Sequence, residues 1–293
     1  MRNVSVAATQ MACTWDKPAN VERAIQLVRA AAGGGAQIIL LQELFETPYF
    51  CIEQRGEHLQ LASERDDNPL LQRFQALAKE LAVVLPISWF ERAGNNFFNT
   101  VCMLDADGSV LGYYRKSHIP NSIGYQEKTY FTPGDTGFQV WDTRYARVGV
   151  AICWDQWFPE AARSMALRGA ELLFYPTAIG TEPGEPDLDS SGHWQRTMQG
   201  HAAANVVPII ASNRIGQELA TGDESLSMRF YGHSFIADYT GEIVQQADDS
   251  SEAVLISDFD LDEAQQYRTQ WGVFRDRRPE LYGDLCMHTP VTC

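Results

Sequence analysis

The residues with the clearest chemical potential surround Cys153, in the segment R-V-G-V-A-I-C-W-D-Q-W-F-P-E-A at 147–161. Apolar and small residues alternate ahead of the cysteine and predict a buried strand, and Pro159 is typical of the first turn of a helix, expected here over 160–168. The turn between these elements falls on Cys153 and Trp154. Backbone N–H groups and the positive end of a helix at such a turn would favour the thiolate, the nucleophilic form of cysteine. The alternative is a structural role, because free cysteine is among the most buried residue types.

Two charged residues follow other predicted strands. Glu43 comes after the apolar run at 38–41, which is typical of a strand buried on both faces. Lys116 follows a predicted strand at 110–114. The alternatives are a glutamate solvated in its loop and an ordinary surface lysine. Because sites in open sheets lie at the carboxyl ends of strands, these groups and Cys153 can converge although they are far apart in sequence.

The rest of the chain predicts alternating helices and strands. The glycines at 33–35 follow a helix, which indicates a helix end and turn and argues against a dinucleotide-binding loop. The segment at 179–192 is too rich in glycine, proline and acidic residues for regular structure, and the loop at 124–135 has the composition of a pocket wall. The other predicted elements are strands at 4–8, 83–90, 99–105, 171–175 and 206–212, helices from Asp16 and over 68–81 and 194–205, and hairpin strands at 231–238 and 253–260 around a turn at 240–242.

Composition limits the classes of partner. The formal net charge of −15 argues against nucleic acid or an anionic membrane surface and weakly favours a cationic small ligand. No run is apolar enough for a signal peptide or a membrane span. The cysteines form no C-x-x-C pair, so we expect free thiols and a cytoplasmic location. Nothing in the composition separates two domains, and residues 1–293 are expected to form a single domain.

Four motifs resemble the carbon-nitrogen hydrolase (nitrilase) superfamily over almost the whole chain. They are L-L-Q-E-L-F around Glu43, Y-R-K-S-H-I-P around Lys116, G-V-A-I-C-W-D-Q-W-F-P-E around Cys153, and W-G-V-F-R-D-R-R-P-E-L-Y at 271–282. The resemblance implies an α/β fold of the nitrilase type, a four-layer α-β-β-α sandwich that assembles into homo-oligomers built from dimers. It gives catalytic roles to Glu43, Lys116 and Cys153, and it matches a second family glutamate to Glu127. No metal and no organic cofactor are expected.

These residue types suit hydrolysis of a C–N bond. Glu43 would remove the thiol proton of Cys153, and the sulfur would attack an amide or ureido carbon. Lys116 and the backbone N–H of Trp154 would stabilise the oxyanion, a role in which losing one donor costs about 2.7–4 kcal/mol. Glu127 would orient Lys116 or the substrate. Glu43 would then protonate the leaving amine or ammonia and activate water to release the enzyme from a thioester-type intermediate.

Within the superfamily, the motifs H-I-P-N-S-I-G-Y-Q-E-K-T-Y-F-T-P-G-D-T-G-F and I-C-W-D-Q-W-F-P-E-A-A-R are most similar to the enzymes that hydrolyse N-carbamoylputrescine to putrescine, CO2 and ammonia, a step in polyamine synthesis. Enzymes that act on N-carbamoyl-D-amino acids have arginines where this chain has Gln156 and Trp157. Because a buried carboxylate without a cationic partner is costly, amino-acid substrates should be rejected.

A small cationic ureido substrate needs a carboxylate or aromatic face for its distal ammonium. Glu182 is the leading candidate and Asp187 the second, and Tyr49, Tyr125 and Trp154 could line the aliphatic arm. Two alternatives stay open. One is a hydrolase of β-ureidopropionate, an ω-amide or another ureido or amide compound. The other is a non-catalytic scaffold in which the cysteine senses redox conditions.

Overall fold

The first layer combines strands from the first 115 residues of the chain with one strand, at 253–260, from near its C-terminal end. The structure, a computed structural model, describes residues 1–185, 188–223 and 225–287. One sheet has the order β14-β1-β2 and a second the order β3-β4-β5. A bridge between Ile38 and Val84 joins them, with the Ile39 N–H donating to the Val84 carbonyl at 3.0 Å. The strands are β1 (Asn3–Gln10), β2 (Ile38–Leu40), β3 (Leu85–Ala93), β4 (Asn96–Leu104), β5 (Val110–Arg115) and β14 (Ala253–Asp260).

The second layer is a six-stranded sheet in the order β13-β12-β9-β8-β7-β6. Its strands are β6 (Val140–Asp142), β7 (Arg147–Val150), β8 (Leu172–Pro176), β9 (Ile209–Ser212), β12 (Phe235–Ala237) and β13 (Ile243–Gln246). β7, β8 and β9 are parallel to one another. Apart from the exposed Arg147 at the start of β7, their residues are apolar, aromatic or small and buried, as expected of parallel strands covered on both faces. A separate antiparallel pair is formed by β10 (Ile215–Leu219) and β11 (Ser227–Tyr231).

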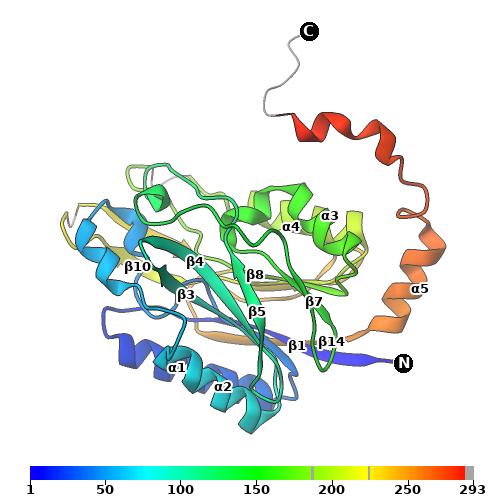
Figure 1. The fold of residues 1–293 in the computed structure, drawn as a ribbon, viewed down its shortest axis with the longest axis horizontal. Helices are drawn as coiled ribbons and strands as arrows, with labels where there is room; N and C mark the ends of the chain where they lie inside the picture. The colour runs from blue at the N-terminus through cyan, green and yellow to red at the C-terminus, as the bar shows by residue number, and fades with distance from the viewer. Residues whose placement is uncertain (186–187, 224, 288–293) are drawn as a thin grey trace.

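Two pairs of helices cover the outer faces of these layers (Figure 1). α1 (Lys17–Gly33) and α2 (Pro69–Leu81) lie along the first layer, and α3 (Pro159–Leu167) and α4 (Ser191–Asn205) along the second. α1 begins where the Asp16 side chain accepts a hydrogen bond from the Ala19 N–H, and α2 begins at Asn68, which caps the helix in the same way. This arrangement confirms the four-layer α-β-β-α sandwich.

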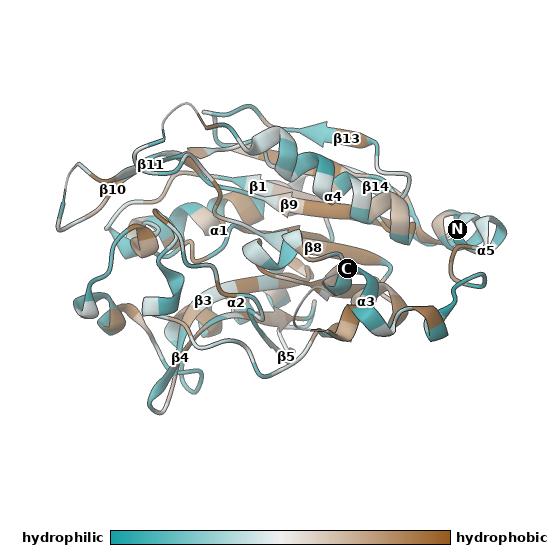
Figure 2. Ribbon diagram, turned by 90° about the horizontal axis from the view of Figure 1, so that it is seen from above, coloured by the Kyte–Doolittle hydropathy of each residue, from teal (hydrophilic) through white to brown (hydrophobic). Residues whose placement is uncertain are grey.

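The largest apolar cluster fills the space between the two layers of strands. Val6, Leu40 and Val101 from the first layer lie in one cluster with Val150 and Phe174 from the second. A second cluster packs α1 and α2 onto the outer face of the first layer. Figure 2 shows the resulting pattern, with hydrophobic residues concentrated in strands such as β8 and β9. Strands buried on both faces have little conformational freedom at their ends. The layers therefore fix the positions at which the following loops begin.

The predicted hairpin at 231–238 and 253–260 is wrong. β14 pairs with β1 in the first layer, and the turn at 240–242 joins β12 to β13 in the second. Two alternating segments separated by a turn signal look like a hairpin locally, but the pairing depends on which sheet offers each strand an apolar face. β10 and β11 were not expected from the sequence either.

The residues that follow β14, from Leu261 onward, form an extension that projects from the layered part of the molecule. α5 (Leu261–Trp271) follows β14, and short 3-10 helices at Pro279–Leu281 and Gly283–Cys286 lie beyond it. Figure 1 shows this segment, orange to red, projecting away from the layers. Further 3-10 helices lie at Phe50–Ile52, Gly56–Leu61, Glu127–Thr129 and Cys153–Trp157. No helix among the residues that the structure describes is long and apolar enough to cross a membrane.

Candidate active site

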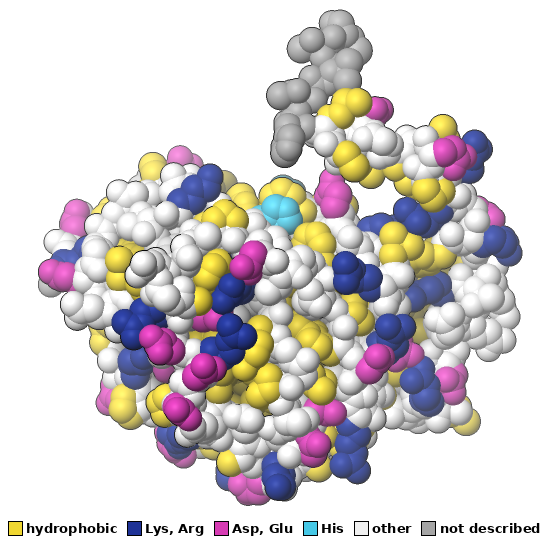
Figure 3. Space-filling view, in the orientation of Figure 1, with side chains coloured by type: hydrophobic (Ala, Val, Ile, Leu, Met, Phe, Trp, Pro, Cys, Tyr) yellow, Lys and Arg dark blue, Asp and Glu magenta, His cyan; other side chains and the backbone are white. Residues whose placement is uncertain are grey.

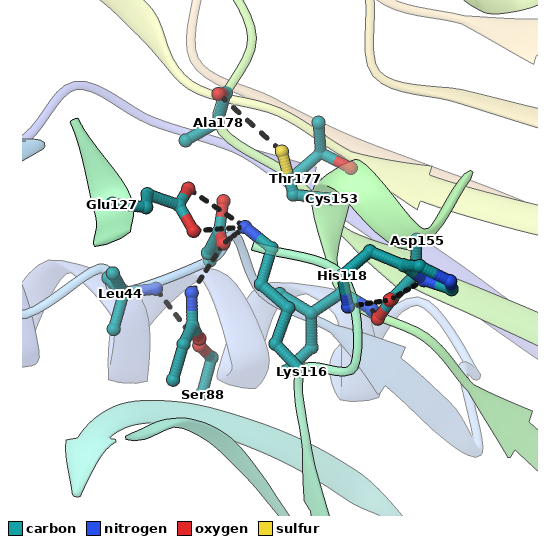
Figure 4. Close-up of polar contacts among 12 residues, drawn as sticks. Leu44, Ser88, Lys116, His118, Glu127, Cys153, Asp155, Thr177 and Ala178 are labelled. Atoms are coloured by element: carbon teal, nitrogen blue, oxygen red, sulfur yellow. Dashed lines mark hydrogen bonds and ion pairs between the residues drawn. The ribbon is translucent and has the colours of Figure 1, made fainter. Parts of the chain in front are cut away.

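Lys116 lies between two buried carboxylates that come from different parts of the chain. Its Nζ donates to Glu43 Oε1 at 2.9 Å and to the two oxygens of Glu127 at 2.8 and 2.7 Å. All three side chains have 0% of their surface exposed. Lys116 directly follows β5, Glu43 follows β2, and Glu127 begins a 3-10 helix. Figure 4 shows the polar ends of Lys116 and Glu127 facing each other below the sulfur of Cys153.

Neighbouring side chains fix the two glutamates in different ways. Asn99 Nδ2 donates to Glu43 Oε1 at 2.6 Å, so this oxygen has two partners, while the buried Oε2 has none. Tyr49 donates its hydroxyl to Glu127 Oε1 at 2.5 Å. An unpartnered buried carboxylate oxygen is costly. Oε2 of Glu43 is thus the carboxylate oxygen of this cluster that is free to accept a proton.

Burial and charge set the pKa values of this cluster. Burial alone would lower the pKa of Lys116, but Glu127 and then Glu43 outweigh it and raise the pKa well above its usual value. Burial raises the pKa of Glu127 to about 7, although the Lys116 ammonium acts against it. One cation therefore serves two carboxylates, and the cluster carries an excess of negative charge.

Cys153 lies on a strained turn. Its φ is +42°, in the left-handed region that non-glycine residues seldom adopt, and its Sγ lies 3.7 Å from the Ala178 carbonyl. Such strain persists only where the surroundings over-determine the backbone. The sequence places this turn correctly, between β7 and α3.

The expected stabilisation of the thiolate is wrong. Burial, followed by the negative charge of Glu43, raises the pKa of Cys153 well above its usual value. α3 begins only at Pro159, so the cysteine lies in the preceding 3-10 turn and not at the first turn of that helix. In the free protein the sulfur is a thiol, which makes a general base necessary for attack.

Asp155 links the cysteine turn to the loop after Lys116. It accepts hydrogen bonds from the Ile152 N–H at 3.0 Å, the His118 N–H at 2.9 Å and the Tyr114 hydroxyl at 2.7 Å. The Nδ1 of His118 lies 2.7 Å from the same carboxylate, and Figure 4 shows this contact. The histidine therefore satisfies a local hydrogen bond.

A pocket of about 250 Å³ opens onto the sulfur. Three residues expected to contact substrate line it, namely Trp154, Tyr125 and the half-buried Glu182. Its other lining residues are Gln156, Trp157, Ile179, Ser190 and His193. Tyr49, expected in the wall, is fully buried and lies against Glu127 instead. Asp187 is outside the described residues.

A family model for carbon-nitrogen hydrolases matches residues 5–269. The chain belongs to this family. It is 60% identical to the N-carbamoylputrescine amidase of Solanum lycopersicum over 282 residues, which cover 96% of this chain and 94% of that enzyme. It is 52% identical to a citrullinase of Francisella tularensis over 285 residues, or 97% and 99% of the two chains. A solved carbon-nitrogen hydrolase from Helicobacter pylori has 36% identity and a TM-score of 0.91, covering 98% of this chain and 100% of that one.

Several residues that shape the site of this carbon-nitrogen hydrolase were not predicted. Asn99 lies within β4, and no local signal distinguishes it from other strand residues. Asp155 stands two residues after the cysteine, so its position in C-W-D-Q could have drawn attention to it. Within 1–185, 188–223 and 225–287, no group of three or more histidine, cysteine or acidic side chains has an arrangement suited to a metal ion.

Proposed function

We propose that this carbon-nitrogen hydrolase cleaves N-carbamoylputrescine to putrescine, CO2 and ammonia. The observation that carries the proposal is the composition of the pocket over Cys153. Its described lining contains the carboxylate of Glu182 and neither lysine nor arginine, which suits a ureido compound with a distal ammonium. The 60% identical N-carbamoylputrescine amidase of Solanum lycopersicum supports the same substrate.

The cluster of Glu43, Lys116 and Cys153 supplies the chemistry. The free Oε2 of Glu43 takes the thiol proton as the sulfur bonds to the ureido carbon. Lys116 and the backbone N–H of Trp154 stabilise the oxyanion that forms on the former carbonyl. When the C–N bond breaks, protonated Glu43 gives its proton to the departing nitrogen, and a thioester-type intermediate remains on Cys153.

Water completes the reaction. Glu43, again a carboxylate, accepts a proton from water as the water oxygen attacks the carbonyl carbon of the intermediate, and it returns that proton to the sulfur as the C–S bond breaks. The carbamic acid that is released loses CO2, which frees the second amine. Glu127 keeps Lys116 directed at the reacting oxygen through its two contacts of 2.7 and 2.8 Å. We assign Glu127 an orienting role because both of its oxygens already accept hydrogen bonds, from Lys116 and Tyr49, whereas Oε2 of Glu43 is free to take a proton.

Cys153→Ala tests the mechanism. We expect ammonia release from N-carbamoylputrescine to fall to background, because no other cysteine of the described chain lines the pocket. Retained turnover would exclude the thiol mechanism. If the native protein hydrolyses no ureido compound or amide and its cysteine reacts only substoichiometrically with iodoacetamide, the non-catalytic scaffold is the better interpretation.

Glu182→Gln tests recognition of the ammonium. We expect KM for N-carbamoylputrescine to rise about tenfold, corresponding to about 1.4 kcal/mol, with kcat little changed. Glu185→Gln is the matched control, because Glu185 is an exposed glutamate that pairs with Glu182 through a backbone bridge and does not line the pocket. An unchanged KM in Glu182→Gln contradicts the assignment of the ammonium clamp.

Citrulline is the second candidate substrate, because the citrullinase of Francisella tularensis is 52% identical to this chain. Citrulline has the same ureido group but also a carboxylate, for which the described lining provides no lysine or arginine. We expect kcat/KM to be higher for N-carbamoylputrescine than for citrulline or 3-ureidopropionate when the three compete in one assay. Preference for either acid overturns the substrate assignment and leaves the chemistry intact.

We further propose a cytoplasmic homo-oligomer built from dimers of a single-domain chain. The extension after β14 supports assembly, because it exposes Trp271, Leu281 and Leu285 at 65%, 62% and 66%, and Figure 3 shows hydrophobic side chains along it. Light scattering during size-exclusion chromatography should give an even multiple of 32.8 kDa. A monomer at assay concentration contradicts this assembly.

A further inference from the structure

The segment that carries the catalytic base has little secondary structure of its own. Residues 41–49 connect β2 to a 3-10 helix, and Leu44 within them has a φ of +49°. Glu43 and Tyr49 both belong to this segment, and through them it contacts Lys116 and Glu127. The position of the base therefore depends on what holds the backbone of this segment.

One guanidinium group donates hydrogen bonds to three backbone carbonyls of the segment. Arg214, which lies between β9 and β10, donates from Nη2 to the carbonyls of Glu43 and Leu44, both at 2.8 Å. Its Nη1 donates to the Thr47 carbonyl at 2.9 Å. Arg214 has 0% of its surface exposed and lies 6.0 Å from the ring of Tyr49.

Glu218 completes the arrangement from β10. Its Oε1 accepts from Arg214 Nη1 at 2.9 Å, and its other oxygen accepts from the Tyr49 N–H. The pair therefore holds both ends of the segment, at Glu43 and at Tyr49. Ser88 adds a bond from the Leu44 N–H to its hydroxyl at 3.0 Å.

A buried ion pair is weak support for stability, because desolvation of the two charges offsets most of their attraction. The contribution of the arginine is to position the backbone, because its rigid planar guanidinium holds several carbonyls in fixed directions. Here the carbonyl of the catalytic base itself is one of them. Geometry of this kind matters to rate, because a displacement of about 1 Å can cost about a hundredfold.

We propose that Arg214, balanced by Glu218, is a positioning residue that holds Glu43 and Tyr49 in register with Lys116 and Cys153. Arg214 does not line the pocket and has no contact with Lys116 or Glu127 among the described hydrogen bonds, so it acts through the backbone. The inference rests on the proposed function for the role of Glu43.

The first test compares Arg214→Met and Arg214→Lys with the native enzyme. We expect kcat to fall about a hundredfold in Arg214→Met, with KM within about twofold, and Arg214→Lys to recover part of the loss because a point charge cannot hold all the carbonyls. Arg268→Met is the matched control, since Arg268 is a half-buried arginine that likewise donates to backbone carbonyls, those of Val206 and Ala170. It should lower the melting temperature and leave kcat unchanged.

Three results overturn the proposal. They are an unchanged kcat in a folded Arg214→Met protein, a loss confined to KM, and an equal loss of kcat in Arg268→Met. If Arg214→Met does not fold, Glu218→Gln is the milder variant. It weakens the grip on the guanidinium, and we expect a severalfold fall in kcat at constant KM. An unchanged kcat in Glu218→Gln contradicts the role.

A second readout does not need the natural substrate. Burial, and after it the carboxylate of Glu43, raises the pKa of Cys153. Movement of Glu43 away from the sulfur should therefore lower the pH at which iodoacetamide alkylates Cys153. Arg214→Met should therefore shift the alkylation midpoint downward, as Glu43→Gln should also do, whereas loss of a nearby cation alone would shift it upward. A downward shift supports the proposal even if N-carbamoylputrescine is not hydrolysed, and an upward or absent shift contradicts it.

Discussion

Arg115 and Lys116 are adjacent in the chain, yet their side chains enter two different clusters of buried charge. Arg115 makes parallel bonds to the carboxylate of Glu91, with Nε at 2.8 Å and Nη2 at 2.7 Å from its oxygens. Thr100 donates a further bond to Glu91 at 2.7 Å. Every oxygen of Glu91 is satisfied, and Arg115 is also paired with the exposed Asp135 at 3.0 Å.

The Lys116 cluster differs in both charge and hydrogen bonding. One ammonium faces the carboxylates of Glu43 and Glu127, all three fully buried, and Glu43 Oε2 has no partner. Proteins retain unsatisfied buried charge where function needs it. The comparison teaches that an excess of carboxylate with a free oxygen, more than burial or ion pairing as such, separates a catalytic cluster from a structural one.

The largest difference between the two clusters should appear when the carboxylate of Glu43 or of Glu91 is removed. Glu43→Gln should reduce kcat about 10²–10⁴-fold, the usual contribution of a general base, with little change in the melting temperature. The matched change Glu91→Gln should lower the melting temperature and leave kcat within about twofold, because it disturbs contacts with Arg115, Thr100 and Arg65 and none with Lys116. Steady-state ammonia release and thermal unfolding of both variants measure this. Equal losses of kcat would erase the distinction between the clusters.

The pH dependence of activity sharpens the comparison at a second residue. Burial raises the pKa of Glu127 to about 7, so its carboxylate becomes protonated as the pH falls through that value and loses its charge pairing with Lys116. We expect kcat/KM to decrease below about pH 7 in the native enzyme. Glu127→Gln should be less active and should lack this acidic limb, because the titrating group is gone.

Glu91→Gln serves again as the control for the pH profile, since its carboxylate has no contact with Lys116. It should keep the native acidic limb. An acidic limb with the native midpoint in Glu127→Gln would assign the titration to another group and refute this prediction.

Arg115→Lys should give the smallest effect. A lysine replaces the two parallel bonds to Glu91 with a point charge, which we expect to cost about 1–2 kcal/mol of the free energy of unfolding. Because Lys116 keeps its own partners, kcat and KM should stay within about twofold. Chemical denaturation and steady-state kinetics measure the two quantities, and a large change in kcat would show that the clusters are coupled through β5.

Local patterns predicted the parts of the fold whose signals lie within a few residues. The helix start at Asp16, the helix over 68–81 and the apolar run before Glu43 all correspond to elements of the structure. The pairing of β14 with β1 could not be predicted, because the two strands lie at opposite ends of the chain and an alternating pattern does not name its partner.

The candidate site divides in the same way. The positions of Glu43, Lys116 and Cys153 at strand ends follow from sequence motifs, as does the placement of Glu182 in the loop that borders the pocket. The role of Asn99, the Glu127 contact of Tyr49 and the grip of Arg214 on the base do not. Each depends on a partner dozens of residues or more away in the chain.

The amino-acid sequence alone determined which chemical groups this protein has, where strands and helices begin, and that a thiol lies on a turn between a strand and a helix. The protonation state predicted for that thiol from the sequence was wrong, because the pKa of Cys153 depends on burial and on the charge of Glu43, which the fold brings beside it. Folding also decided which carboxylate oxygen stays free and which carbonyls Arg214 holds. Hydrogen bonds and charge interactions act over a few ångströms of space, and only the packed layers convert distant positions in the chain into such short distances.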